Sequence, residues 1–166
     1  MSYEVDIQRL ETCALIDLQG AQERIRDWVD PGFPDFPTTP NTAVTHQGLS
    51  LYWLAPEKWL LRAPAGREDE LQTISRLQSA PVDISIVLVS DTLQFFSIEG
   101  TDAEQIVAIA SPLDTHAKVF PENGVSYTEV FGLKGLLIRI PGGFEIAVES
   151  SFADMIEDYL ARTTAC

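Results

Sequence analysis

The segment LYWLAPEKWLLRAP at residues 51–64, followed by EDELQTISRL at 68–77, decides the fold because the chain repeats it. The second copy is LIRIPGGFEIAVES at residues 137–150, followed by FADMIEDYL at 152–160. Self-similarity at a constant spacing indicates that one structural unit occurs twice. The matched pairs are Pro56 with Pro141, Trp59 with Phe144, and Leu71 with Ile156.

The repeat extends toward the N-terminus. CALIDLQG at residues 13–20 corresponds to QFFSIEG at 94–100, and a helix-like run follows each copy. VDISIVLV at 82–89 is rich in β-branched residues and is predicted to be the first strand of the second copy. Each half is therefore predicted to run strand, strand, helix, linker, three strands, helix. The halves are expected at about residues 3–79 and about 80–163 of a single domain spanning 1–166.

Two of the predicted helices begin with capping signals. Thr101 followed by Glu104 has the spacing of a capping box, and Ser151 followed by Asp154 is an imperfect version of it. Apolar residues then follow at helical spacing, and we expect both apolar stripes to pack in the core. The stripes are Ala103, Ile106, Val107 and Ala110, and Phe152, Met155, Ile156, Tyr159 and Leu160.

Turns and linkers occupy matching places in the two halves. Gly142–Gly143 is predicted to form a hairpin turn, and Pro56–Lys58 is predicted to form its counterpart. The linker Asp30–Pro40 is too rich in proline for regular structure, and Ser111–Asn123 occupies the same place in the second half. Loops at such places commonly carry binding surfaces.

Large aromatic residues gather around the first linker and the first hairpin. We expect them to form an exposed apolar patch that docks other proteins. A second interpretation, cross-strand aromatic packing, stays open for the two tryptophans beside the hairpin. The candidate interface residues are Trp28, Phe33, Phe36, Trp53 and Trp59.

Composition excludes several classes of function. The 166 residues are 45% hydrophobic, which is typical of a folded globular chain. A formal charge of −14 disfavours binding to nucleic acid or to anionic membranes. The charged N-terminus lacks a secretory signal, and no apolar run is long enough to cross a membrane, so a cytoplasmic protein is expected. Cys13 and Cys166 have no metal-binding spacing, and no metal site is expected.

Catalytic motifs are scarce. No glycine-rich phosphate loop and no nucleophile elbow occur in the sequence. The only histidines are His46, predicted at a turn, and His116. Asp114 precedes His116 by two residues, so the pair could perform acid–base chemistry. Alternatively, Asp114 accepts backbone amides in an Asx turn. These motifs assign no catalytic residue to the chain.

Several motifs, in order, resemble one family. They are LAPEKWLL at 54–61, PLDTH at 112–116 with Phe120-Pro121, and SSFA at 150–153. In this order and spacing the chain resembles the gamma subunit of heterotetrameric sarcosine oxidase, from about Leu10 to Leu160. The region after Val89 is similar, more distantly, to the folate-binding domain of aminomethyltransferases.

The resemblance implies a fold and a role. The fold of the wider family is α+β, with two pseudo-symmetric halves that exchange their first strands. The role is that of a non-catalytic subunit that assembles with alpha, beta and delta subunits. Such a complex demethylates sarcosine oxidatively, giving glycine, hydrogen peroxide and, with tetrahydrofolate, methylene-tetrahydrofolate. The resemblance places FAD, FMN, NAD, zinc and tetrahydrofolate on the other subunits and none on this chain.

One departure from the aminomethyltransferases bears on activity. Those enzymes carry an acidic residue in the segment that corresponds here to Gly132–Leu137, which contains Lys134 and no carboxylate. A protonated lysine cannot accept a proton from an amine, so the transferase activity is not expected. The isolated chain is expected to be inactive, and its uncovered interface would favour a homodimer.

Two alternatives stay open. A stand-alone folate-binding one-carbon-transfer protein would need a carboxylate in a concave site, and Asp91, Asp114 or Glu129 would have to supply it. A subunit of a related N-methyl amino acid dehydrogenase, such as one acting on N-methylglutamate, would share the same sequence features because other chains select the substrate.

Overall fold

The structure is a computed structural model that describes residues 3–165. Both halves follow the predicted order of elements, and the chain is of mixed α and β class. The first half contains β1 (Asp6–Arg9), β2 (Cys13–Gln19), α1 (Gln22–Trp28), β3 (Ala43–His46), β4 (Leu49–Ala55), β5 (Lys58–Pro64) and α2 (Glu68–Ser75). The second half contains β6 (Ser85–Leu88), β7 (Leu93–Glu99), α3 (Ala103–Ala110), β8 (Val125–Val130), β9 (Leu133–Ile140), β10 (Gly143–Glu149) and α4 (Ala153–Thr164).

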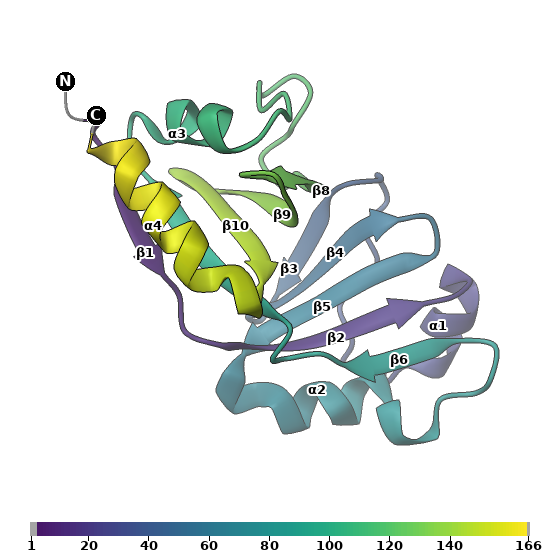
Figure 1. The fold of residues 1–166 in the computed structure, drawn as a ribbon. Coiled ribbons are helices and arrows are strands. Elements are labelled where there is room, and N and C mark those ends of the chain that lie inside the picture. The colour runs from purple at the N-terminus through teal and green to yellow at the C-terminus, as the bar shows by residue number, and fades with distance from the viewer. Residues whose placement is uncertain (1–2, 166) are drawn as a thin grey trace. The chain divides into compact units, whose positions relative to one another are not determined.

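The chain forms two compact units, each built on a five-stranded antiparallel sheet (Figure 1). Unit 1 comprises the described parts of Met1–Glu11 and Thr92–Cys166, with strand order β1-β7-β10-β9-β8. Unit 2 is Thr12–Asp91, with strand order β3-β4-β5-β2-β6. Strand β1 pairs with β7 of the second half, and β6 pairs with β2 of the first half. The sheet built mainly from the second half of the sequence therefore contains β1, the first strand of the first half. The sheet built mainly from the first half contains β6, the first strand of the second half.

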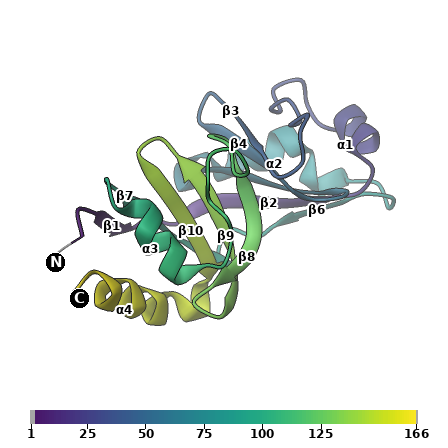
Figure 2. The same cartoon turned by 90° about the horizontal axis from the view of Figure 1, so that it is seen from above.

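In unit 1, helices α3 and α4 cover one face of the sheet (Figure 2). The predicted stripe of α3 is buried against Phe96, Ile98 and Phe144. The stripe of α4 is only partly buried, because Tyr159 remains 37% exposed and Phe152 lies in a short 3-10 turn before the helix. The members of α4 that reach the core are Ala153, Ile156 and Leu160.

In unit 2, helices α1 and α2 and the proline-rich linker pack on one face of the sheet. Ile25 of α1 and Leu71 of α2 are fully buried there. Arg24 of α1 also donates to the Asp83 carboxylate just before β6, at 2.6 Å, and this hydrogen bond lowers the pKa of Asp83. The strand predicted over 82–89 is limited to β6, and the residues before it form a turn.

The capping boxes expected at Thr101 and Ser151 are wrong. No side chain caps α3 or α4. The Thr101 hydroxyl instead donates to the carboxylate of Glu4, and Ser151 donates to Glu149. Asp102 accepts the backbone N–H of Glu4 at 2.8 Å. The start of α3 is therefore fixed by a residue distant in sequence, which a local spacing rule cannot detect.

Both predicted hairpin turns are confirmed. The β4–β5 turn places Glu57 at a φ of 56°, and the β9–β10 turn places Gly142 at a φ of 83°. The two tryptophans beside the first turn face each other directly across β4 and β5, with ring centroids 6.2 Å apart. Cross-strand packing, the second of the two interpretations offered for Trp53 and Trp59, is therefore what the structure shows.

Candidate functional site

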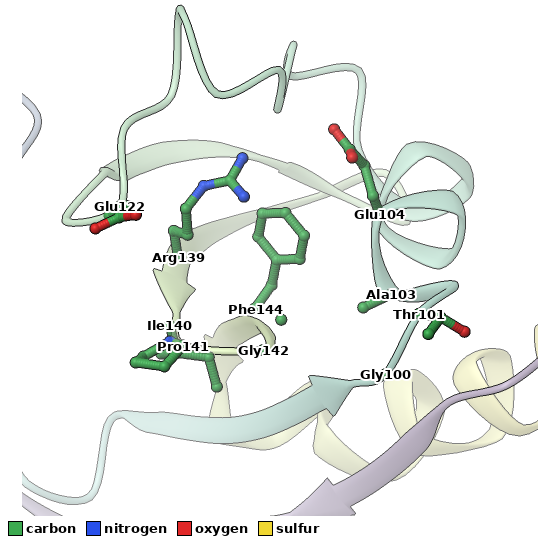
Figure 3. A pocket seen from close by; sticks show the side chains of 11 residues that line it. Gly100, Thr101, Ala103, Glu104, Glu122, Arg139, Ile140, Pro141, Gly142 and Phe144 are labelled. Atoms are coloured by element: carbon green, nitrogen blue, oxygen red, sulfur yellow. The ribbon is translucent and has the colours of Figure 1, made fainter.

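A pocket of about 500 Å³ lies in unit 1 between the start of α3 and the β9–β10 hairpin (Figure 3). Its volume lies within the range typical of small-molecule sites. The walls include Gly100, which follows β7, and the hairpin residues Pro141–Gly143. The ring of Phe144 forms the floor. Arg139 of β9, Glu104 of α3 and Glu122 of the linker before β8 supply three charged groups.

Two glycines allow the backbone to close around this pocket. A Cβ atom on Gly143 would overlap the carbonyl oxygen of Ile98 on the neighbouring strand β7. A Cβ atom on Gly100 would overlap the carbonyl oxygen of Glu4, and its φ of 131° also favours glycine. The junction of β7, β10 and α3 therefore depends on residues without side chains.

Arg139 connects the pocket to the linker Ser111–Asn123. Its Nε atom donates to the carbonyl of Phe120 at 3.0 Å, and its Nη2 atom donates to the carbonyl of Thr115. The guanidinium also lies over the ring of Phe144, 4.7 Å from the centroid, and over the ring of Phe120, 5.7 Å away. Within the part of the chain that the structure describes, Arg139 forms no ion pair with a carboxylate. Its two acceptors are neutral carbonyl groups, so neither of these hydrogen bonds joins it to a carboxylate.

The linker is held at the pocket by buried residues. Thr115 is buried, and its hydroxyl donates to Glu104 at 3.1 Å. Phe120 is also buried. Arg139 and Glu104 therefore both hold the same linker, which contributes Glu122 to the pocket lining.

The acid–base pair considered for Asp114 and His116 does not form. Asp114 accepts the backbone N–H of His116 at 2.9 Å, as in an Asx turn. The imidazole Nδ1 of His116 accepts the backbone N–H of Lys118 at 3.3 Å. Both side chains are exposed, and neither lines the pocket. The loop is ordered by these contacts around Thr115, and Asp114 does not orient the imidazole.

The aromatic residues proposed as an exposed docking patch are largely buried. Phe33, Phe36 and Trp59 belong to the core of unit 2, where the edge of one ring meets the face of the other in the Phe36–Trp59 pair. Trp28 and Trp53 are half-buried and pack against the same core. The expectation that all five form an exposed surface is therefore corrected, because the linker folds back and buries its own aromatic side chains.

The carboxylates required for a folate-transfer site do not gather at this pocket. Asp91, Asp114 and Glu129 are all exposed and none lines it. In the segment Gly132–Leu137, Lys134 is exposed and lies over the ring of Tyr127, 4.6 Å from its centroid. Lys134 therefore makes a surface contact and does not occupy a proton-accepting position.

Reversing the charge of Lys134 is expected to leave folding intact. Lys134→Glu would face Glu129 across β8 and β9, and two opposed carboxylates at an exposed pair cost about 1 kcal/mol or less. Urea unfolding followed by circular dichroism measures the difference. Lys134→Gln, which removes only the positive charge, is the matched control. A loss above about 2 kcal/mol would show that Lys134 is part of the core, against its surface position.

The remaining sequence expectations concern metals and membranes. Within residues 3–165, no three His, Cys, Asp or Glu side chains are placed to hold a metal ion. Cys13 is buried in β2 and accepts a hydrogen bond from Arg62 Nε at 3.2 Å. No helix over the same residues has the length and apolarity needed to span a bilayer. The other cysteine, Cys166, lies outside the described residues.

A family model for the sarcosine oxidase gamma subunit matches residues 36–166. The chain belongs to the sarcosine oxidase gamma subunit family. The match covers most of the chain. It includes every residue of the pocket in unit 1, together with Phe36 of the first linker and Phe120 of the second. The resemblance inferred from the sequence motifs is thereby confirmed.

Solved structures support the fold of this family member. A chain of the heterotetrameric sarcosine oxidase from Corynebacterium sp. U-96, determined with pyrrole 2-carboxylate, matches with a TM-score of 0.78 and 18% identity. The match covers 97% of this chain and 84% of that one. The glycine cleavage system aminomethyltransferase T from Bartonella henselae matches with a TM-score of 0.67 and 15% identity. There the match covers 96% of this chain and 46% of that one. None of the curated protein sequences matches the chain.

Proposed function

We propose that this chain is the non-catalytic gamma subunit of a heterotetrameric sarcosine oxidase, assembled with alpha, beta and delta subunits in the cytoplasm. The observation that carries the proposal is the family match over residues 36–166. The likeness in fold to a chain of the heterotetrameric enzyme, over 97% of this chain, supports it. The assembled complex would oxidise sarcosine to glycine and pass the one-carbon unit to tetrahydrofolate.

The flavins, NAD, zinc and folate of that complex are proposed to bind the other subunits. For folate, the residues of this chain argue against a transfer site. The segment Gly132–Leu137 offers the exposed ammonium of Lys134 where a proton acceptor is needed. The contribution of this chain is then structural, and its surfaces rather than a reacting group perform its role.

The two sequence halves are proposed to be pseudo-symmetric copies of the folate-binding-domain type. In unit 1, Phe144 of β10 faces Ile98 of β7, and in unit 2, Trp59 of β5 faces Leu18 of β2. The strand pairing thus aligns the positions that the sequence repeat matches. The first strand of each half pairs with the second strand of the other half, β1 with β7 and β6 with β2. This reciprocal exchange supports an origin by duplication.

The purified chain alone is expected to be colourless and inactive. Because the flavins are assigned to other subunits, it should show no absorbance at flavin wavelengths and produce no hydrogen peroxide from sarcosine. An absorbance scan and a peroxidase-coupled assay measure both properties, with the intact complex as the positive control. Turnover by the chain alone, after removal of any partner chains, would contradict the non-catalytic role.

A further inference from the structure

The pocket of unit 1 presents a cation that forms no direct ion pair with a carboxylate of the described residues. Arg139 is half-buried, and its two hydrogen-bond acceptors are the neutral carbonyl groups of Phe120 and Thr115. A guanidinium has five N–H donors, and these two bonds leave others available. A partly desolvated cation beside aromatic rings gains from a counter-ion with which it can form hydrogen bonds.

The second charged group is on the opposite side of the same space. Figure 3 shows the guanidinium of Arg139 and the carboxylate of Glu104 extending from opposite sides toward the region above the Phe144 ring. Glu104 keeps its position through the hydroxyl of Thr115 and does not pair with Arg139. Thr115 connects the two charges, because its carbonyl accepts from Arg139 and its hydroxyl donates to Glu104, and both charged side chains line the pocket.

This arrangement selects the kind of ligand. A phosphate or other dianion would meet Arg139 but would be repelled by Glu104 and by the nearby carboxylate of Glu122. A simple amine would meet the carboxylates but would be repelled by the guanidinium. The floor and one wall, Phe144 with Ile140 and Pro141, are apolar and suit a compact hydrocarbon group.

We propose that this pocket binds a small α-amino acid in its zwitterionic form, with the carboxylate on Arg139 and the ammonium group on Glu104. The apolar body of the ligand rests on Phe144. A planar carboxylate matches the free edge of a guanidinium and forms charge-assisted hydrogen bonds with it. Binding joins two groups that both hold the linker Ser111–Asn123, so an occupied pocket also stabilises that linker.

The proposal is tested by titrating the full-length chain with glycine, L-proline and L-valine. Isovalerate lacks the ammonium group of valine and isobutylamine lacks its carboxylate, so these are the matched single-charge probes. Calorimetry, or chemical shifts of Arg139 and Glu104 amides, measures the dissociation constants. At least one amino acid should bind saturably, and about tenfold or more tightly than either single-charge probe. Absence of saturable binding by all three amino acids would overturn the proposal, as would equal binding of isovalerate.

Variants distinguish this site from others on the surface. Arg139→Gln and Glu104→Gln should each weaken amino-acid binding about tenfold or more, since each removes one charge contact. Glu104→Gln keeps an acceptor for Thr115, so it remains informative even where Arg139→Gln loosens the linker. The controls are Lys134→Gln, which removes an exposed cation from the same strand β9, and Glu129→Gln, which removes an exposed carboxylate from β8. Both variants should bind the amino acids with the affinity of the unchanged chain. Equal weakening by the controls would place the binding elsewhere.

Discussion

Trp59→Ala is expected to lower the free energy of unfolding by about 3–5 kcal/mol. Trp59 is 1% exposed and lies in the core of unit 2, where Phe36 contacts it edge to face with ring centroids 5.3 Å apart. Truncation leaves a cavity that neighbouring strands cannot fill, and it also removes the ring that Trp53 packs against. For a domain of ordinary stability this is a large share of the total.

Denaturant unfolding followed by fluorescence and circular dichroism measures this loss. Val82→Ala in the same unit is the control, because Val82 is fully exposed and its truncation should change stability by less than about 0.5 kcal/mol. Trp59→Phe should cost much less than Trp59→Ala. It retains an aromatic ring and removes an indole N–H that is buried without a hydrogen-bond partner in the described part of the chain. Equal stability of Trp59→Ala and Val82→Ala would contradict the packing of this core.

Gly143→Ala is expected to cost about 3 kcal/mol. Gly143 begins β10 and pairs with Glu99 of β7, and an added Cβ would overlap the Ile98 carbonyl and lie 2.9 Å from the Glu99 Cα atom. Because both obstacles are backbone atoms, the two strands must separate and lose pairing at the edge of the pocket. The effect should appear in thermal unfolding and in reduced protection of the β7 amides from hydrogen exchange.

Gly142→Ala is the matched control for this prediction. Gly142 is adjacent in sequence and a Cβ there meets no atom, so its cost comes only from its φ of 83°. That backbone conformation costs a non-glycine residue about 1 kcal/mol. If Gly143→Ala were no more costly than Gly142→Ala, the close approach of β10 to β7 would be wrong.

The repeated segments made most of the fold predictable. A hairpin turn at Pro56–Lys58 and another at Gly142–Gly143 follow from local residue preferences, and the apolar stripe of α3 follows from its spacing. The cap predicted at Thr101 does not form because its hydroxyl donates to Glu4, far away in sequence, whereas the Ser151 hydroxyl donates to Glu149, two residues before it. Long-range partners override local motifs where a tertiary contact satisfies the same groups.

The functional surfaces were harder to predict for a related reason. Phe33 and Phe36 stand among prolines, and exposed aromatic residues in a linker are a reasonable expectation for an interface. The linker instead folds onto the sheet of unit 2, and its rings complete the core. Aromatic residues in irregular segments can serve either purpose, and sequence alone does not separate the two.

Arg139 is the opposite case, a pocket residue to which the sequence motifs assign no role. It interrupts the apolar run LLIRI of β9, and a charged residue in such a run is a usable signal. The linker carbonyls that hold it come from Thr115 and Phe120, and only the three-dimensional structure brings them together. Part of the pocket wall is backbone at Gly100 and Gly143, which has no pattern of side chains to detect.

Affinity purification of the tagged chain from its native source tests whether the chain is a subunit of a sarcosine-oxidising complex. Three other chains should co-purify in fixed stoichiometry, with flavin absorbance and sarcosine-dependent production of hydrogen peroxide in the same fraction. Recovery of the chain alone and colourless, from cells that are oxidising sarcosine, would contradict this subunit role.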